Sequence, residues 1–507
     1  MHGFQASSLK LGLVVALAVP FAVGQVGIGP ITTGVKFAKK HVGHPASTIA
    51  SGFALQQVVK GSDPLENPSG AITTFGALTD GTLTEADENT YVVLDQNPGG
   101  PVPGYDYGRH FLFQGHENQG NLAYLTRINL DVTAKAHRIT LLTPVGNGGV
   151  TGFNAIDGST YNPFSNTILF TQEDGGATLE VNVTWPPQLR TLDGTLGVKG
   201  YEGIHPDDKG NLILAEDIGG VSVNVDPNDP NSPKSARQPN SFVYRLLPYD
   251  PANLPAGGKL QVLQVTIDGA PLVFHANDPV GDVFAVNQLR LHSPGTSYPV
   301  QWVTIHDTAV DGFAPFDENA LAKAAGGTPF KRPENLQFLP GSGYQTFFFC
   351  PTGDTNSNSG NQPALAQRGA WGSIFRVDLN EDRSGGWISI FVLGTAEQSS
   401  FDNLSFADDH TLLAAEDRGD TLHTQLNRLD SIWAYTTDGS EPPLRLLALG
   451  RDKIAEVKGD NEPTGIHVSN GSTAIDGQPG TIDNLLGARA FFTRQHGQNV
   501  VYEIVKE

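Results

Sequence analysis

The feature that most constrains the fold of this chain is an internal repeat without gaps. Tyr201–Gly220 (YEGIHPDDKGNLILAEDIGG) returns two hundred residues later as Phe401–Asp420 (FDNLSFADDHTLLAAEDRGD). Each copy opens with an acidic residue, passes through a turn into an apolar strand and ends in Glu-Asp. Repetition over such a distance indicates that one supersecondary unit is used several times. It also indicates that each unit directs carboxylates the same way.

Many short strands joined by tight turns are predicted around this repeat. The 507 residues include 59 glycines and 34 prolines, and only 17% are charged, which is typical of strand-rich chains. Four antiparallel strands per unit, repeated about six times, predict an all-β fold, a six-bladed β-propeller. The last strand, Val500–Val505, has no fourth partner after it, so we expect an N-terminal strand to close the ring. A two-sheet sandwich is the main alternative, but it would give the repeated carboxylates no common focus.

The N-terminus has the pattern of a signal peptide, assigned to residues 1–24. Lys10 precedes the apolar run Leu11–Val23, and Ala22-Val23-Gly24 is a candidate cleavage site. The run is too short to span a bilayer comfortably. The chain is therefore expected to be secreted or periplasmic. Its single cysteine, Cys350, rules out an intramolecular disulfide and is expected to pack as a small apolar residue.

Two further segments differ from the strand pattern. Residues 25–85 are rich in Gly, Thr and Ala and are predicted to form an N-terminal arm. The propeller is assigned to 86–507. Within it, residues 276–329 break the strand rhythm and are predicted to be a small helical insertion with a helix over 320–325. The sequence leaves open whether this insertion is a lid over the channel mouth or blade decoration.

The net charge of −21 limits the partners of the chain. Binding to nucleic acid or to an anionic membrane gains from counterion release by Lys and Arg, so neither partner is expected. Clustered carboxylates instead favour hard cations such as calcium. A bound cation would also stabilise a secreted chain that lacks disulfides. We expect the protein to be a monomer.

The candidate site is a set of carboxylates at equivalent blade positions. At strand openings stand Asp157, Glu202, Glu334, Asp402 and Glu462, and at strand ends stand Glu117, Glu173, Asp174, Glu216, Asp217, Asp354, Glu416, Asp417 and the pair Gln495-His496. On a propeller many of these converge on one mouth of the channel, where unpaired carboxylates repel one another. Calcium, which takes roughly six to eight oxygen ligands, would relieve that repulsion. The plainer interpretation is that each Glu-Asp pair is a solvated turn or a helix cap.

Arg332 stands apart from this acidic set. It lies two residues before Glu334, and residues two apart in an extended chain point to the same side. Arg332 is therefore expected beside the carboxylates. There it would either offset excess negative charge or grip an oxyanion in two-pronged fashion. A cation together with metal ions fits the recognition of phosphate or of a phosphate ester.

In this order, the motifs resemble the secreted PhoX-type alkaline phosphatase family of propellers. The matching pieces are His116-Glu117, Thr171-Gln172-Glu173-Asp174, Glu202 with Glu216-Asp217, Arg332-Pro333-Glu334, Asp402 with Glu416-Asp417, and Glu462-Pro463-Thr464-Gly465 with Gln495-His496. The resemblance implies a six-bladed propeller that hydrolyses small organic phosphate esters at a cluster of iron and calcium ions. It also implies that the metal ligands are Glu117, Glu173, Glu202, Asp217 and Glu334. Arg332 would hold the phosphoryl group.

One position departs from the family pattern, which has a cysteine where Gln172 stands. A thiolate suits iron, whereas a glutamine amide suits calcium, so calcium is expected and iron is in doubt. Three functions stay open. The first is a metal-dependent phosphoric-ester hydrolase, the second a calcium-dependent propeller lactonase, and the third a non-catalytic, calcium-stabilised propeller. Arg332 favours the first, because a lactonase does not require an arginine that grips an anion.

Overall fold

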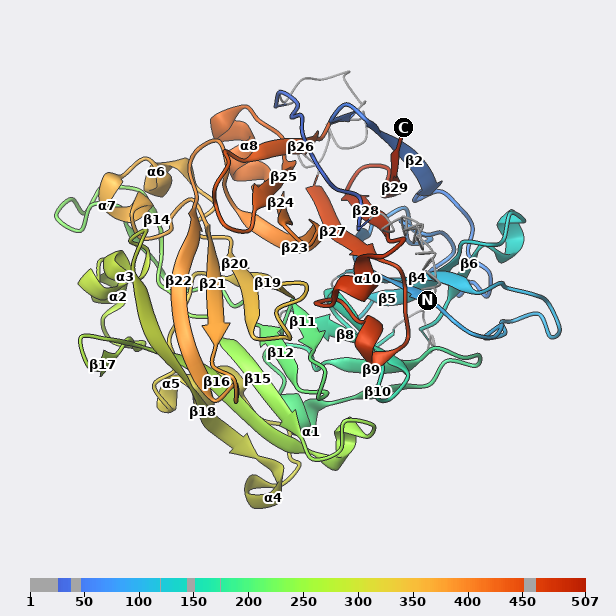
Figure 1. Cartoon of the computed structure of the whole chain (residues 1–507), viewed down its shortest axis with the longest axis horizontal. Coiled ribbons are helices and arrows are strands. Elements are labelled where there is room, and N and C mark those ends of the chain that lie inside the picture. The colour runs from blue at the N-terminus through green and yellow to red at the C-terminus, as the bar shows by residue number, and fades with distance from the viewer. Residues whose placement is uncertain (1–25, 38–46, 119, 144–150, 174, 451–461) are drawn as a thin grey trace, which may run out of the picture.

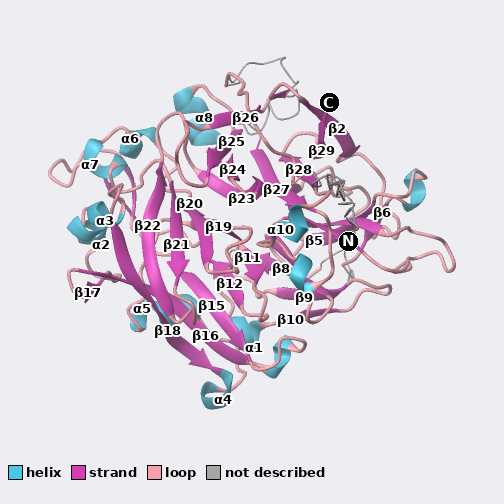
Figure 2. Ribbon diagram, in the orientation of Figure 1, coloured by secondary structure: helices cyan, strands magenta, loops and turns pink. Residues whose placement is uncertain are grey.

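The computed structural model is dominated by antiparallel strands, with short helices in the connections (Figures 1 and 2). It describes residues 26–507 apart from 38–46, 119, 144–150, 174 and 451–461. The predicted signal peptide at 1–24 lies outside the described residues. The prediction of an all-β fold is confirmed.

Four sheets of four or five strands stand separately around the molecule. They consist of β3 (Glu85–Val93), β4 (His110–Glu117), β5 (Tyr124–Asn129) and β6 (Ile139–Leu141); β7 (Ile156–Asn162), β8 (Thr167–Gln172), β9 (Leu179–Asn182) and β10 (Leu189–Thr191); β23 (Phe401–Asp408), β24 (Thr411–Glu416), β25 (Ser431–Thr436), β26 (Leu444–Ala448) and β1 (Thr48–Ile49); and β27 (Glu462–Ser469), β28 (Arg489–Gln495), β29 (Val500–Lys506) and β2 (Phe53–Val59). Each of these sheets is one blade of a propeller-like arrangement.

The fifth large sheet is continuous over ten strands. Its order is β11 (Ile204–Pro206), β12 (Leu212–Ala215), β15 (Val243–Pro248), β16 (Gly258–Ile267), β18 (Ser297–Asp307), β22 (Gly385–Leu393), β21 (Ser373–Leu379), β20 (Thr346–Pro351) and β19 (Pro333–Phe338), with β17 (Ala270–Pro271) paired to β16. A separate hairpin, β13 (Ser222–Asn224) and β14 (Lys234–Arg237), lies outside it. The described residues thus form four separate blades and one long sheet rather than six separate blades.

The innermost strands contact one another in a closed circuit. Contacts run from β3 to β7, β11, β19, β23 and β27 and return to β3. The predicted closure by an N-terminal strand is confirmed, because β2 pairs antiparallel with β29. This pairing removes a bare sheet edge. The centre is crossed by Glu88 of β3, whose carboxylate accepts from Ser159 N at 2.7 Å and from Asn335 Nδ2.

Apolar side chains fill the space between neighbouring sheets. The inner strand β12 reads LILA and is buried throughout, as expected for a strand covered on both faces. At the closure, Val59 of β2 and Val501 of β29 pack with Phe491 and Tyr91, so the first and last sheets share one core. The strands nearest the centre are therefore held firmly, and side chains at their ends are placed with little freedom.

Helices are short and join the strands. They are α1 (Asp193–Leu196), α2 (Pro279–Val283), α3 (Val286–Leu291), α4 (Thr308–Asp311), α5 (Glu318–Ala324), α6 (Ser357–Gly360), α7 (Pro363–Ala366), α8 (Gly419–Leu426) and α10 (Ile482–Leu485). Among the described residues, none of the helices has the length and apolar character needed to cross a membrane.

The segment predicted to be an insertion, 276–329, contains helices α2 to α5 and also the long strand β18. The helix expected over 320–325 is confirmed as α5. Strand β18 pairs with β16 on one side and with β22 on the other, so it joins two groups of strands into the ten-stranded sheet. The segment is thus part of the framework, because β18 satisfies two sheet edges at once.

Candidate metal centre

Four carboxylates meet where β8, β11, β12 and β19 come together. One oxygen from each of them lies within 4.8 Å of the others, and the residues are Glu173, Glu202, Asp217 and Glu334. Glu202 and Glu334 are buried, whereas the other two are half-buried. We call this set the first carboxylate group.

The β11–β12 hairpin positions two members of this group. Glu202 N donates to Ala215 O at 2.9 Å and Gly203 N donates to Glu334 O at 2.7 Å, so the hairpin is tied to its neighbour β19. A Cβ at Gly158 of β7 would lie 1.8 Å from the Glu202 carbonyl oxygen, so only glycine allows β7 this close. Glu202 is therefore fixed by backbone contacts on both sides, and Asp217 follows β12 of the same hairpin.

A second carboxylate group comes from the neighbouring blades. It consists of Asp87 in β3, Glu117 at the end of β4 and Asp157 in β7, again with one oxygen of each within 4.8 Å of the others. Gln495 Nε2 donates to Asp87 Oδ2 at 2.7 Å and to Glu117 Oε2 at 3.2 Å. The two groups are adjacent, because Glu173 N of the first group donates to Ala155 O at 2.9 Å, two residues before Asp157 of the second.

Burial and mutual repulsion shift these carboxyl groups strongly. Burial raises the pKa of Glu202 well above its usual value, and the carboxylates of Glu334 and Asp157 raise it further. Burial also raises the pKa of Asp87 to about 6 and that of Glu334 to about 7. The same causes raise the pKa values of Glu117, Asp157 and Glu173 well above the usual range. Carboxylates packed this closely destabilise a fold unless cations or protons neutralise them.

The donor atoms fit a hard cation. Glu202 Oε2 and Asp157 Oδ1 are buried and have no hydrogen-bond partner among the described residues. Both groups consist of carboxylates alone, and an all-oxygen set is what calcium prefers. Unpaired buried carboxylate oxygens of this kind are satisfied when they coordinate an ion.

Gln172, at the position that departs from the family pattern, is engaged elsewhere. Its Oε1 accepts from Asn154 N at 3.1 Å, and its Nε2 donates to Ala177 O. The amide therefore ties two loops together. Cys350 does not replace a missing thiolate: it is buried in an apolar cluster and its Sγ donates to Asp402 O at 2.6 Å, as expected for a packing residue.

Arg332 lies beside the first group, as expected from its spacing to Glu334. Its Nε and Nη2 donate to Asp217 at 2.9 to 3.1 Å, and its Nη2 is 3.0 Å from Glu334 Oε1. Burial lowers the pKa of Arg332, but the two carboxylates outweigh burial and raise it above its usual value. Within the described part of the chain, Nη1 has no hydrogen-bond partner.

The expected extended backbone at Arg332 is wrong. Its φ is +55°, in the left-handed region that costs a non-glycine residue about 1 kcal/mol or more. The guanidinium thus reaches Asp217 and Glu334 through a turn before β19 rather than along a strand. Strained backbone of this kind persists where the surrounding contacts determine it, here through Asp217 and Glu334.

A cavity of about 640 Å³ opens beside the first group. Its lining residues are Glu173, Gly175, Lys199, Asp217, Ile218, Gly219, Arg237 and Arg332. Three of these eight carry a positive charge, and two, Glu173 and Asp217, are carboxylates of the first group. The cavity is therefore suited to a small anion or an ester that approaches the carboxylates.

Of the five ligands implied by the resemblance, the structure brings four together and places Glu117 in the second group. The two glutamates that recur in both copies of the repeat, Glu216 and Glu416, lie elsewhere. Glu216 Oε2 accepts from Phe242 N at 3.0 Å and from Asn319 Nδ2 at 2.9 Å, and Glu416 Oε1 accepts from Ser399 N at 3.0 Å. The expectation that strand-end acids converge is therefore wrong for these two, because they satisfy neighbouring backbone and side-chain donors.

Sequence reasoning missed two kinds of residue. Asp87 was missed because it lies at the boundary drawn between the N-terminal arm and the propeller, whereas β3 runs across that boundary as Glu85–Val93. The strand-opening acids of the other blades were the pattern that would have identified it. Arg237 and Lys199, which line the cavity, had no sequence pattern at all, because their positions depend on tertiary contacts.

Comparison with known proteins gives one family match. The model of the family described as alkaline phosphatase PhoX matches residues 222–454, which confirms the resemblance found in the sequence. The matched region includes Arg332, Glu334 and Arg237, while Glu117, Glu173, Glu202 and Asp217 precede it. A search of curated proteins gave no match.

Solved structures give distant likenesses. A candidate phosphatase from Bacteroides thetaiotaomicron is 10% identical, with 90% of this chain and 79% of that chain covered and a TM-score of 0.37. The calcium-binding protein regucalcin from Agrobacterium tumefaciens is 12% identical, with 82% and 92% covered and a TM-score of 0.36. The PQQ domain of pyranose dehydrogenase from Coprinopsis cinerea is 14% identical, with 91% and 97% covered and a TM-score of 0.30. Likenesses this distant carry no information on function.

Proposed function

We propose that this chain belongs to the PhoX-type alkaline phosphatase family, whose model matches residues 222–454, and that it is a metal-dependent phosphoric-ester hydrolase. Its substrates are small organic phosphate esters. The reaction takes place at the two carboxylate groups. The ester reaches them through the neighbouring cavity.

The observation that carries this proposal is the position of Arg332. Its guanidinium is fixed by Asp217 and Glu334 at the edge of the carboxylates, and it lines the cavity. A guanidinium whose fork is bound to carboxylates on one side can still donate from its free Nη1 to a phosphoryl oxygen. An arginine held at a carboxylate cluster in this way suits the recognition of an anion. A lactonase, which polarises a carbonyl group, needs no such arginine.

The metal ions of the proposal are held by the two carboxylate groups. The first group, Glu173, Glu202, Asp217 and Glu334, would supply ligands at one side, and Asp87, Glu117 and Asp157 would supply them at the other. Bound calcium would act as a Lewis acid toward the phosphoryl oxygens and offset their charge. Calcium is proposed rather than iron, because both sets offer carboxylate oxygens and Gln172 bonds to backbone groups.

The residues of the chain bind and orient the ester. Arg332 directs Nη1 toward the phosphoryl group, while its Nε and Nη2 are bound to carboxylates. Asp217 orients Arg332 by accepting from both of these nitrogens. Because Arg332 is held before the substrate arrives, little side-chain entropy is lost on binding.

The proposal extends to the architecture and the compartment. The ten-stranded sheet is interpreted as two blades joined by β18, which with four separate blades makes a six-bladed propeller. Residues 1–24 are proposed as a signal peptide, residues 25–85 as an N-terminal arm and 86–507 as the propeller. The protein would then act, as a monomer, outside the cytoplasm, without a nucleic-acid or membrane partner.

The test is to assay the purified protein with p-nitrophenyl phosphate, bis-p-nitrophenyl phosphate and a lactone, each with calcium, with iron and after chelation. We expect calcium-dependent release of p-nitrophenol from the monoester. Turnover of the lactone alone would contradict the proposal and favour a lactonase. Absence of all turnover, with a melting temperature that rises when calcium is added, would favour a non-catalytic propeller.

Replacing Arg332 tests its role. R332K keeps the charge but loses the fork, and we expect kcat/KM for the monoester to fall about tenfold to a hundredfold, with a larger loss in R332A. The matched control is R383K, because Arg383 also has a positive φ of 57° and pairs with two aspartates, Asp207 and Asp208. Equal losses in both variants would show that the effect is on folding rather than on the ester.

A further inference from the structure

We propose that the cavity beside the carboxylates is a second anion subsite, in which Arg237 and Lys199 bind a further negatively charged group of the ester. The preferred substrates are then phosphate monoesters that also carry a carboxylate or a second phosphate. This inference rests on the proposed function and deepens it, because it names the class of substrate.

The charges that line the cavity are the first evidence. The chain has 53 acidic and 32 basic residues, yet three of the eight lining residues are basic. Arg332 is neutralised by Asp217 and Glu334. Lys199 Nζ lies 3.4 Å from Asp317 Oδ2, but both side chains are more than 40% exposed, so water screens this pair.

Arg237 is the decisive residue, because its guanidinium is unpaired. Among the described residues, no hydrogen bond or ion pair involves its side chain, although the residue is half-buried. Burial lowers the pKa of Arg237, and the neighbouring charge of Arg332 lowers it further, although Asp217 acts in the opposite sense. Two guanidinium groups that face one cavity repel each other, and an anion bound between them would remove that repulsion.

The backbone that carries Arg237 is fixed on both sides. Arg237 N donates to Asp354 Oδ1 at 3.0 Å, and Asp354 is in turn paired with Lys331 at 2.8 Å. The next residue, Gln238, is buried and its Nε2 donates to Asp282 Oδ2 at 2.7 Å. The short hairpin that carries Arg237 is therefore anchored to the turn that follows β20 and to the helical segment around α2.

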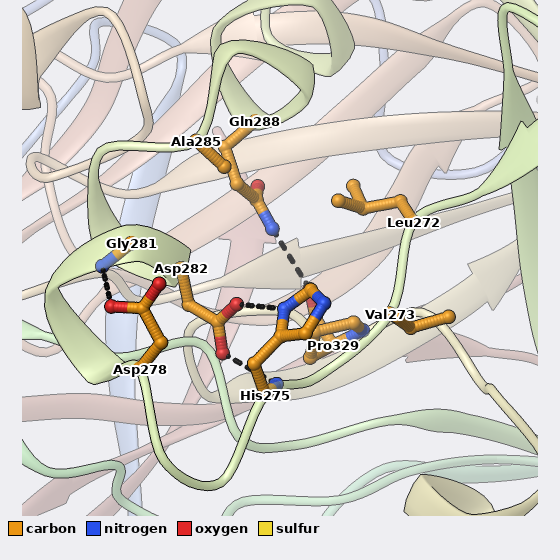
Figure 3. Close-up of a pocket in the computed structure, with 9 residues that line it drawn as sticks. All are labelled: Leu272, Val273, His275, Asp278, Gly281, Asp282, Ala285, Gln288 and Pro329. Carbon is orange, nitrogen blue, oxygen red and sulfur yellow. Dashed lines mark hydrogen bonds and ion pairs between the residues drawn. The ribbon is translucent and has the colours of Figure 1, made fainter.

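Asp282 is itself held by a histidine. Figure 3 shows its carboxylate against His275, whose Nδ1 lies 2.6 Å from Oδ1 and whose backbone N donates to Oδ2 at 2.8 Å. Asp282 thus accepts from Gln238 and His275 together. This network leaves Arg237 little backbone freedom while its guanidinium stays unpaired, which is the arrangement expected of a preorganised binding residue.

The volume of the cavity is large enough for a second anionic group of the ester. At about 640 Å³ it exceeds the space that one phosphate needs, and the basic residues Lys199 and Arg237 line it together with Arg332. A phosphoryl group bound at Arg332 would leave these two cations for another anion on the same molecule. Ile218 supplies the apolar part of the lining, which suits a short carbon linker.

The test compares 3-phosphoglycerate with glycerol 3-phosphate, which differ mainly in that a carboxylate replaces a hydroxymethyl group. We expect the wild-type protein to prefer 3-phosphoglycerate in kcat/KM by at least tenfold. In R237Q the ratio of the two kcat/KM values should fall about tenfold to a hundredfold, as is typical of a lost charged hydrogen bond. K199Q should lower the ratio less, because Lys199 is more exposed.

A matched control is R190Q. Arg190 is a half-exposed arginine that pairs with Glu180 on another blade, so the ratio should not change. A wild-type protein that hydrolyses both esters equally, or a ratio that survives in R237Q, would overturn the second subsite while leaving the proposed function intact.

Calorimetric measurements of binding distinguish a failure of the subsite proposal from a failure of the proposed function. If neither ester is hydrolysed, the proposed function fails, but the affinity of the calcium-loaded protein for the two esters can still be compared. Tighter binding of 3-phosphoglycerate that R237Q abolishes would support the subsite by itself. Equal affinities in the wild-type protein would overturn it.

Discussion

At the scale of single residues, the two copies of the repeat differ at one position in a way that explains their different surroundings. Ile218 lines the cavity in the first copy, whereas Arg418 stands there in the second. Arg418 is fully buried, and its guanidinium donates to Glu416, to Ser399 and to backbone carbonyls. A side chain that fills its surroundings in this way leaves no room for a ligand. The cavity therefore belongs to the first copy.

The burial of His292 also makes the stability of the protein depend on pH. This side chain is buried at the end of α3, and its Nδ1 donates to Gln288 O at 2.8 Å. Burial lowers the pKa of His292 to about 4. As the pH falls below about 6.5 the unfolded chain takes up a proton that the folded chain refuses, so stability present above pH 6.5 is lost toward pH 4.

We expect H292N to make this acid-induced loss shallower. Asparagine keeps a donor for the Gln288 carbonyl and removes the ionisable ring, so roughly 3 kcal/mol of the loss between pH 6.5 and 4 should disappear. The measurement is the free energy or midpoint of unfolding across that range. H410N is the control, because the side chain of His410 is 84% exposed. If H292N loses stability toward acid as steeply as the wild type, His292 takes up its proton in the folded protein as easily as in the unfolded chain, and the prediction is wrong.

The sequence located some of the candidate site and missed the rest for physical reasons. Glu202, Asp217 and Glu334 were predicted to lie together because repeated units direct equivalent residues to one place, and the structure brings them together. Arg237 was missed, because a lone arginine at the end of the short strand β14 has no periodic pattern. Its place depends on Asp354 and on the contacts of Gln238, which come from distant parts of the chain.

At the scale of elements, helix α5 fastens the insertion to the blade that carries Glu202 and Asp217. Glu318 accepts from Val198 N at 2.8 Å and from Lys199 N at 2.7 Å. Asn319 Nδ2 donates to Glu216 Oε2 at 2.9 Å and to Asn240 O at 2.8 Å. The helix therefore supports Lys199 and the buried Glu216 at the same time.

We expect N319L to destabilise the protein by about 2 kcal/mol, because Glu216 and the Asn240 carbonyl lose a buried donor. Thermal or denaturant unfolding measures the loss. The control on the same helix is A320Q, since Ala320 is exposed and its replacement should change stability by less than about 0.5 kcal/mol. An unchanged midpoint for N319L would show that water replaces the asparagine.

Sequence patterns identified most strands but not the way in which the sheets join. The largely apolar runs at 242–247 and 260–267 can be read in the sequence, and they correspond to the paired strands β15 and β16. Strand β18 was hidden in a segment whose helices broke the rhythm, although its own sequence, SYPVQWVTIHD, is rich in β-branched and aromatic residues. Its pairing with two partners is a long-range property that no local pattern reports.

At the scale of the whole molecule, the ring is closed by residues from opposite ends of the chain. Val59 of β2 is opposite Val501 of β29 and is fully buried. The shared core of the first and last sheets depends on this contact. Without it two sheet edges would be exposed, which invites pairing with other chains.

We expect V59D to destabilise the protein by several kcal/mol, because an aspartate would be buried without a partner. The melting temperature and the fraction of soluble monomer measure the effect. Q57D is the control on the same strand, where the side chain is exposed. If V59D and Q57D have the same melting temperature, the closure contributes little to the stability of the ring.

The pairing of β2 with β29 also fixes the order of events when the protein is made. Strand β2 is made long before its partner β29, because most of the described chain lies between them. Until then β2 has no native neighbour on that side, and closing so long a loop is slow. The ring therefore cannot close before β29 has been made. The time in which β2 waits for β29 is when the chain is most exposed to aggregation or to a chaperone.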